Sequence, residues 1–503
     1  MRRLLYILLG ILALLFIAQA WLSLQWPIAH DEAPLFYEAF LMRAEGSIPY
    51  RDIFDFQMPG SFAAYYALGT LSGFNAFGIR ILDMLILLSL IVITFFFMQR
   101  FGRMAAFAAA ILFGLKYLQG GPSMALQREY LLLIFIALAV WISMRDMLTP
   151  KHRFTLGLLF GLSAIIKPHA AIGLIPILLF DIADMIKGRK LTLFTTSPLG
   201  NAAVRSILPA FAGFFIPIIV VVAWLTLNNA LTPFLEIATN YWPLYSQING
   251  LMEITPKAER ISFLLNQVWR LGGNGLWLIP AMLGVYLNQN KRIVLLASLA
   301  LCYAIYPALS GQFFQYHYIP FIYFIILLAS LSISTFDLRP STINKYLLVI
   351  IFFAVIFLDV RPSSAFLRQL EGKPVITSTY RANEIARFLE GNLHEGDTIQ
   401  PLDWTGGTLL AMLETHTRIA TPYVFDFYFY HHVSSPYIQS LRMDFLDRMR
   451  IAHPRFIIEV TAADKPWIVG EDASREFPEF RKFLRENYSI KIQKDDYAIY
   501  ERY

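Results

Sequence analysis

The sequence has few cysteines and few charged residues. Its single cysteine, Cys302, lies inside an apolar run, which excludes an intramolecular disulfide or a cysteine-based metal site. The glycine pair Gly406-Gly407 is not part of a G-x-G-x-x-G segment, so the usual dinucleotide fingerprint is missing. Charged residues make up 16% of the chain, and the net charge is +6. Most of the Lys and Arg residues lie in short loops between apolar runs, so they do not indicate a nucleic-acid partner.

Apolar residues are abundant instead. They make up 57% of the 503 residues, and the mean hydropathy is +0.52. A soluble domain is roughly 45–50% apolar, so much of this chain must lie in a bilayer. The enrichment ends near Arg361. We therefore predict a transmembrane domain over 1–360 and a soluble domain over 361–503. The segment Ala18-Gln19-Ala20 resembles a signal-peptidase site, but the many later spans favour an uncleaved first helix.

The apolar runs predict a polytopic α-helical membrane protein with about eleven spans. These runs cover residues 4–24, 81–98, 104–118, 127–144, 154–166, 169–186, 206–228, 265–287, 293–309, 318–336 and 345–359. Several are short for a core of about 30 Å. The break at Lys167-Pro168-His169 could be a turn between two spans or a kink in one.

The positive-inside rule favours the turn. With eleven spans, the basic residues of the short loops collect on one side, the cytoplasmic side: Arg2, Arg3, Arg100, Arg103, Arg145, Lys151, Arg153, Lys187, Arg189, Lys190, Arg205, Lys291, Arg292, Arg339 and Lys345. The segments 25–79, 119–127, 167–169, 229–264, 310–317 and everything after about 360 then lie outside. We therefore expect the soluble domain on the non-cytoplasmic side, with the protein in the inner (cytoplasmic) membrane of a bacterium.

The first outer loop, 25–79, holds the richest acidic cluster of the membrane half, beginning with Asp31 and Glu32. A carboxylate near the lipid boundary can have its pKa raised by burial into the range of a general base. Asp31 could equally be the N-cap of a short amphipathic helix from about Glu32 to Glu45. Acidic groups at membrane depth are usually functional, which favours a chemical role.

The same loop resembles a known superfamily. Asp31-Glu32 just after the first span, an amphipathic helix, then Gly46-Ser47-Ile48-Pro49-Tyr50-Arg51-Asp52 and a proline-containing turn into Tyr65-Tyr66 resemble the first outer loop of GT-C glycosyltransferases. The protein O-mannosyltransferase and lipid A aminoarabinose transferase group is the nearest branch. This resemblance implies an integral membrane enzyme that uses a polyprenyl-phosphate sugar donor and often carries a soluble C-terminal domain.

The resemblance also implies roles for individual acidic residues. Asp31 matches the catalytic aspartate, which takes the proton of the acceptor hydroxyl in a single displacement that inverts the anomeric centre, and Glu32 stands beside it. Glu129 resembles the second acidic residue, which could orient the acceptor or hold a divalent metal ion. A structural pair with Arg128 is the alternative.

One expected residue is missing. Relatives carry a lysine before a proline pair, and this lysine contacts the donor phosphate, but this chain reads Gln57-Met58-Pro59-Gly60. Four cations on the same face could replace it: Arg128, Lys167, His169 and His317. Pairing of Arg128 with Glu129 and snorkelling of Lys167 to the headgroups are the structural alternatives. A zinc site is possible by ligand type, but no spacing signature supports it.

The part after 361 alternates strands and helices, which predicts an α/β domain. We expect a helix near 378–392, a strand after Gly396, a helix after Gly407, a strand at 455–460, a helix at 474–487 and a hairpin at 488–502. The aromatic run 423–432 is expected to pack on the membrane domain or to stack on an acceptor sugar. The loop 229–264 is either a lid over the donor or an interfacial segment.

These features favour an inverting glycosyltransferase that takes a sugar from a polyprenyl-phosphate donor. The acceptor would be an envelope glycan, a lipid or a protein at the outer face. The alternatives are a lipid-linked glycan polymerase or ligase, which would need several outer arginines for pyrophosphate, and a transporter, which should show polar residues at mid-membrane. The spans are mostly free of charge, which argues against the transporter.

Overall fold

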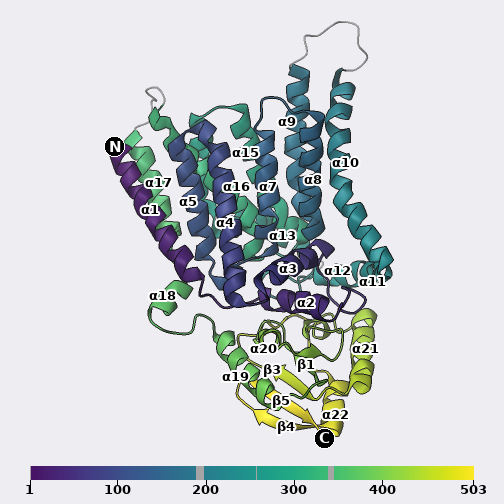
Figure 1. The fold of residues 1–503 in the computed structure, drawn as a ribbon. Helices are drawn as coiled ribbons and strands as arrows, with labels where there is room; N and C mark the ends of the chain where they lie inside the picture. The colour runs from purple at the N-terminus through teal and green to yellow at the C-terminus, as the bar shows by residue number, and fades with distance from the viewer. Residues whose placement is uncertain (1, 188–197, 257, 338–344) are drawn as a thin grey trace.

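The chain forms a bundle of helices with a small α/β domain at one end (Figure 1). The computed structural model describes all residues except 1, 188–197, 257 and 338–344. Three of the basic residues that indicated the orientation, Arg189, Lys190 and Arg339, lie outside the described residues.

Six helical segments are long and apolar enough to cross a membrane: Arg3–Ser23, Ala76–Phe101, Pro168–Ile186, Val204–Leu227, Lys291–Ser310 and Gln315–Ser334. A bent pair, Tyr346–Asp359 with Ser364–Leu370, would make a seventh. The shorter helices α5 (Arg103–Gln119), α7 (Leu133–Ser143) and α8 (Pro150–Ile166) also belong to the bundle. The total of about eleven spans therefore remains a prediction.

The expected span 265–287 is wrong as a single helix. It is divided into α13 (Arg260–Arg270) and α14 (Leu278–Leu287). Leu271, Gly272 and Gly273 between them have positive φ angles of 50°, 60° and 81°. An α-helix cannot continue through that conformation, which Gly adopts readily.

The break at Lys167 is a turn, as the charge distribution indicated. Helix α8 ends at Ile166, a 3₁₀ turn covers Pro168–Gly173, and α9 (Leu174–Lys187) follows. Arg153 near the start of α8 binds Asp181 near the end of α9, with Nε 2.7 Å from Oδ2. Residues this far on either side of the break can meet only if the two helices run in opposite directions.

The first outer loop forms two helices that lie between the bundle and the C-terminal domain (Figure 1). Helix α2 spans Glu32–Ala44, as expected, and α3 spans Pro59–Ser72. Asp31 occupies the N-cap position of α2, but its side chain makes no capping hydrogen bond. Asp31 is thus the N-cap residue by position, as expected, but its carboxylate does not cap the helix and is left for other contacts.

The C-terminal domain is a five-stranded sheet in the order β2-β1-β3-β5-β4. Strands β1 (Thr398–Leu402), β2 (Arg418–Ile419) and β3 (Phe456–Val460) are parallel, while β4 (Tyr488–Gln493) and β5 (Tyr497–Arg502) form the antiparallel hairpin. Helices α19 (Thr377–Asn392), α20 (Thr408–Glu414) and α22 (Pro478–Asn487) lie close to the expected positions. Helix α21 (Pro436–Ala452) was not expected.

The aromatic run 423–432 packs on the membrane half, which confirms that expectation. The ring of Tyr428 lies 4.8 Å from that of Phe54, and its hydroxyl donates to the Phe54 carbonyl at 3.1 Å. The loop 229–264 joins this contact through α11 (Leu231–Glu236) and α12 (Trp242–Tyr245), with Tyr245 4.1 Å from Phe56. Three segments distant in sequence thus meet beside the first outer loop.

Candidate functional site

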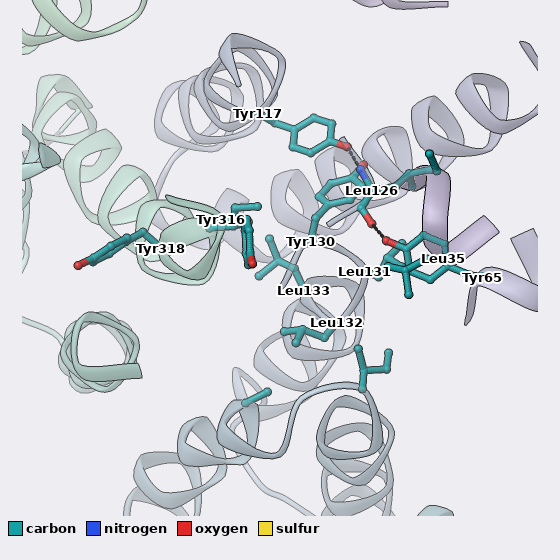
Figure 2. Packing of buried hydrophobic residues seen from close by; sticks show 14 of the residues in the cluster. Leu35, Tyr65, Tyr117, Leu126, Tyr130, Leu131, Leu132, Leu133, Tyr316 and Tyr318 are labelled. Atoms are coloured by element: carbon teal, nitrogen blue, oxygen red, sulfur yellow. Dashed lines mark hydrogen bonds between the residues drawn. The ribbon is translucent and has the colours of Figure 1, made fainter. Parts of the chain in front are cut away.

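The segment that carries Arg128 and Glu129 is fixed by tyrosines. Tyr65 donates to the Leu126 carbonyl at 2.7 Å, and the Leu126 N–H donates to the Tyr117 hydroxyl at 3.0 Å (Figure 2). Tyr117 stacks on Tyr130 at 4.0 Å. Leu126 itself has a φ of +49°, which turns the chain into the short helix α6 (Arg128–Leu131). Because these contacts come from two other helices, α3 and α5, they hold the start of α6 in one orientation.

Asp31 lies between His30 and Arg128. Its Oδ1 is 3.0 Å from His30 Nδ1, and its Oδ2 is 3.2 Å from Arg128 Nη2. The Asp31 residue is only 6% exposed. A buried carboxylate with two such neighbours is held in its charged form.

The environment of Asp31 differs from the expectation in one respect. Burial would raise the pKa of Asp31, as we expected, but His30, Arg128 and Lys167 together lower it below its usual range. The same contact with Asp31 raises the pKa of His30, against the effect of its own burial. Asp31 is thus ready to accept a proton at neutral pH, but its basicity is weakened as long as these cations remain in place.

Glu129 organises a second group of side chains. Its Oε1 lies 3.2 Å from Lys167 Nζ and 3.4 Å from His317 Nε2, and it accepts from the Tyr306 hydroxyl at 3.3 Å. Lys167 Nζ and His317 Nε2 are 3.5 Å apart. The structure therefore brings Glu129, Lys167 and His317 together, and Lys167 faces this group rather than the headgroup region.

Arg128 belongs to the group around Asp31. It contacts Asp31 and also donates to the side-chain carbonyl of Gln57, the residue that stands near the missing lysine. Its guanidinium carbon lies 5.8 Å from the centre of the Tyr316 ring. Its Nε is buried without a hydrogen-bond partner among the described residues. Arg128 is thus fixed in place and retains a free donor.

Glu32 does not face this cluster. Both of its carboxylate oxygens accept from the Arg80 guanidinium, at 2.6 and 2.5 Å, and the Ala29 N–H donates to it at 3.1 Å. Arg80 also lies 3.9 Å from Asp83. Arg80 and Glu32 are fully buried. Arg80 stands directly before the apolar run 81–98, and an arginine at that position could have indicated a buried acidic partner.

A second pair of carboxyls was not singled out from the sequence. Glu38 and Asp55 are both fully buried, and burial raises the pKa of Asp55 to about 7. Burial and the nearby Asp55 raise the pKa of Glu38 well above its usual range. Tyr428 of the C-terminal domain donates to Asp55 at 3.3 Å. Both residues stand in the acidic loop, but the fold alone shows that they meet.

His169 lies at the edge of the Glu129 group, beside Tyr306. Its ring is 6.3 Å from that of Tyr306, and it lines an apolar groove of about 510 Å³. The other lining residues come from the turn after α8 and from α9, α10 (Pro198–Leu227) and α15 (Lys291–Ser310). They include Ile172, Leu178, Phe211 and Leu309.

The hypothesis of a divalent metal ion finds no ready ligand set. Within the part of the chain that the structure describes, no group of three or more His, Cys, Asp or Glu side chains is arranged to hold a metal. Glu129 and His317 meet, but Lys167 occupies the third position around the carboxylate.

Comparison with known proteins finds one family and several solved structures that are similar to this chain. The family described as dolichyl-phosphate-mannose-protein mannosyltransferase matches residues 59–224. The crystal structure of ArnT from Cupriavidus metallidurans bound to undecaprenyl phosphate is similar in fold. It covers 97% of this chain and 97% of its own chain, with 11% identity and a TM-score of 0.55. The chain therefore shares its fold with ArnT.

Other solved structures show weaker similarity to this chain. ArnT from the same organism in the apo state has 12% identity over 97% of both chains and a TM-score of 0.49. The archaeal oligosaccharyltransferase AglB from Archaeoglobus fulgidus has 10% identity and a TM-score of 0.45. It covers 91% of this chain and 69% of its own. Among curated proteins, a sequence search finds no match.

The family match covers only part of this chain. It begins at α3 and ends within α10, so it includes Arg128, Glu129 and Lys167. Asp31 and His317 lie outside it. The roles that we assign to Asp31 and His317 therefore depend on the contacts described above and not on the family match.

Proposed function

We propose that this protein transfers a sugar from a polyprenyl-phosphate donor to an acceptor hydroxyl at the outer face of the membrane, with inversion of the anomeric centre. The acceptor belongs to an envelope glycan, a lipid or a protein. The observation that carries the proposal is the meeting of the buried carboxylate of Asp31 with the cation Arg128, beside a second group built on Glu129.

The geometry suits a single displacement. The acceptor oxygen bonds to the anomeric carbon as its proton passes to Asp31, and the bond from the anomeric carbon to the phosphate oxygen breaks. The electron pair of that bond stays on the departing polyprenyl phosphate. Arg128, Lys167 and His317 are the groups placed to stabilise its charge. Glu129 orients Lys167 and His317 through their contacts.

Binding of the donor would also prepare the base. In the structure, Arg128 Nη2 lies 3.2 Å from Asp31 Oδ2 and stabilises the charged carboxylate. A phosphate that takes the guanidinium bidentately competes with Asp31 for the same N–H groups. The pKa of Asp31 would then rise toward its usual value, so the carboxylate becomes a better base when the donor is in place.

The apolar groove beside His169 fits the polyprenyl chain. Its lining is almost wholly apolar and lies on membrane helices, while His169 stands at the turn that also carries Lys167. A lipid tail in the groove would thus place its phosphate near Lys167, with His169 as a further donor. In this arrangement His169 contacts the donor from the groove, although it does not bind Glu129.

The test of this function is donor turnover. We expect the purified chain to release undecaprenyl phosphate from labelled undecaprenyl-phosphate sugars when envelope glycans, lipids or peptides are added. Thin-layer chromatography separates the two lipids. Turnover only of pyrophosphate-linked donors would instead support the polymerase or ligase alternative.

Sidedness is part of the same proposal. We place the loop 25–79 and the domain 361–503 together on the non-cytoplasmic side of the inner membrane, with 1–360 as the transmembrane domain. Because Tyr37 donates to the Thr417 carbonyl at 2.8 Å, the loop and the domain must share one side. Cysteines introduced at Arg51 and Lys482 should both react with an impermeant maleimide in intact cells. Labelling that requires permeabilisation at both positions would place this whole face in the cytoplasm.

A further inference from the structure

The C-terminal domain contains a small cavity whose polar atoms are incompletely bonded. It measures about 10 Å³, room for one water molecule or one hydroxyl group. Its lining residues are Trp404, Asp426, Phe427, Tyr430, Lys465, Pro466, Trp467 and Ile468.

Lys465 in this cavity has no free donor. Its ammonium bonds to Asp426 Oδ2 at 2.5 Å, to the Leu402 carbonyl at 3.1 Å and to the Val460 carbonyl at 3.2 Å. These three contacts use all of its N–H groups. Lys465 therefore compensates the charge of Asp426 and takes no ligand itself.

Two other polar atoms are left. Asp426 Oδ1 and Trp467 Nε1 are both buried and have no hydrogen-bond partner among the described residues. The first is an acceptor and the second is a donor, and both side chains line the cavity. A hydroxyl group can donate to one and accept from the other at the same time. Burial of either atom without a partner would be costly.

The cavity lies where ligands bind in open α/β sheets. Leu402 and Val460, which contact Lys465, are the last residues of the parallel strands β1 and β3, and such sheets bind ligands outside the carboxyl ends of their strands. This edge faces the catalytic loop. The ring of Trp404 lies 6.3 Å from that of His30, the neighbour of Asp31, and 4.7 Å from that of Phe427.

From this geometry we infer that the cavity is an acceptor subsite for a glycan. One hydroxyl of a sugar ring enters the cavity between Asp426 Oδ1 and Trp467 Nε1, and the apolar face of the ring lies on Trp404, which is half-buried at the rim. A glycan fits better than a peptide, because a polyhydroxyl ring supplies both the hydroxyl and the apolar face in one rigid unit. This inference rests on the proposed function, because it specifies a glycan as the acceptor of the proposed sugar transfer.

Trp467→Phe tests the subsite most directly. It removes the Nε1 donor but keeps an aromatic ring against Lys465, whose Nζ lies 4.3 Å from the ring centre. Full-length protein in detergent would be applied to a printed array of bacterial envelope oligosaccharides. We expect the wild type to bind a subset of these glycans, and Trp467→Phe to bind the same subset about tenfold more weakly, as for one lost hydrogen bond.

Tyr488→Phe is the matched control. It also removes one buried hydrogen bond, from the Tyr488 hydroxyl to the Pro454 carbonyl at 2.8 Å, but at the opposite edge of the sheet. We expect unchanged glycan binding for this variant. Asp426→Asn provides a second measurement, with weakened binding expected on the same glycans.

Three results would overturn the subsite: no binding to any glycan, equal binding by the wild type and Trp467→Phe, or transfer to a serine- or threonine-containing peptide with no glycan accepted. The array measures binding without turnover. Glycan binding that is lost in Trp467→Phe, in a protein that releases no undecaprenyl phosphate, would refute the proposed reaction and retain the subsite.

Discussion

Asp31→Asn is expected to lower sugar transfer by about 100- to 10,000-fold, the range that a positioned general base contributes. The amide keeps the shape of the side chain and can still accept from Arg128, but it cannot take the proton of the acceptor hydroxyl. The measurement is kcat for release of polyprenyl phosphate by purified protein, together with the Kd for the donor. Donor binding should change little, so the loss should fall on kcat.

Two neighbouring carboxyls serve as comparisons for Asp31. Asp52→Asn changes a partly exposed residue in the same loop, which pairs with Arg51, and should leave transfer unchanged. Glu32→Gln should be milder than Asp31→Asn in rate but should lower the thermal stability, because it weakens the buried pair with Arg80. Near wild-type transfer by well-folded Asp31→Asn would refute the assignment of the base.

Arg128→Gln is expected to lower the rate by about tenfold to a thousandfold, since it removes the fork that would neutralise the departing phosphate. Glutamine can still donate a hydrogen bond but carries no charge. Unlike Asp31→Asn, this change should also weaken donor binding, because the ground-state phosphate is already charged. Both kcat and the KM for the donor would be measured.

The control for Arg128 is Arg51→Gln, which removes an arginine of similar reach from the exposed part of the loop. We expect no change in either constant. Arg128→Lys should recover part of the rate, because an ammonium retains the charge without the planar fork. A donor-bound structure in which Arg128, Lys167 and His317 all lie beyond hydrogen-bonding distance of the phosphate would reject the whole set.

The sequence predicted the parts of the site better than their pairing. Asp31 and Glu129 were singled out by the resemblance of their segments to GT-C enzymes and by the rarity of acidic groups at membrane depth. Lys167 and His317 were singled out as cations expected on the same face. Which anion meets which cation depends on how α2, α6, the turn after α8 and the residues before α16 (Ile319–Ser330) pack, and no local pattern encodes that packing. Arg128 therefore binds Asp31 and Gln57, although Glu129 is its neighbour in sequence.

The fold, too, was predicted in part from the sequence. The turn at Lys167 followed from charge, and most elements of the C-terminal domain followed from periodicity. The break at 271–273 was missed because the apolar run continues through it, although two glycines mark the position. Helix α21 was missed because the aromatic run before it obscured where the helix begins.

The aromatic contact between the first outer loop and the C-terminal domain bears on the order of synthesis. Phe54 and Phe56 emerge from the ribosome early, whereas Tyr428, which packs on both, follows almost at the end of the chain. Until the last domain has folded, the loop that carries Asp31 exposes an apolar surface on its side of the membrane. A chain stopped before that point would present this surface to chaperones and proteases, while a finished chain conceals it. Completion of the active site and escape from quality control would thus depend on the same event.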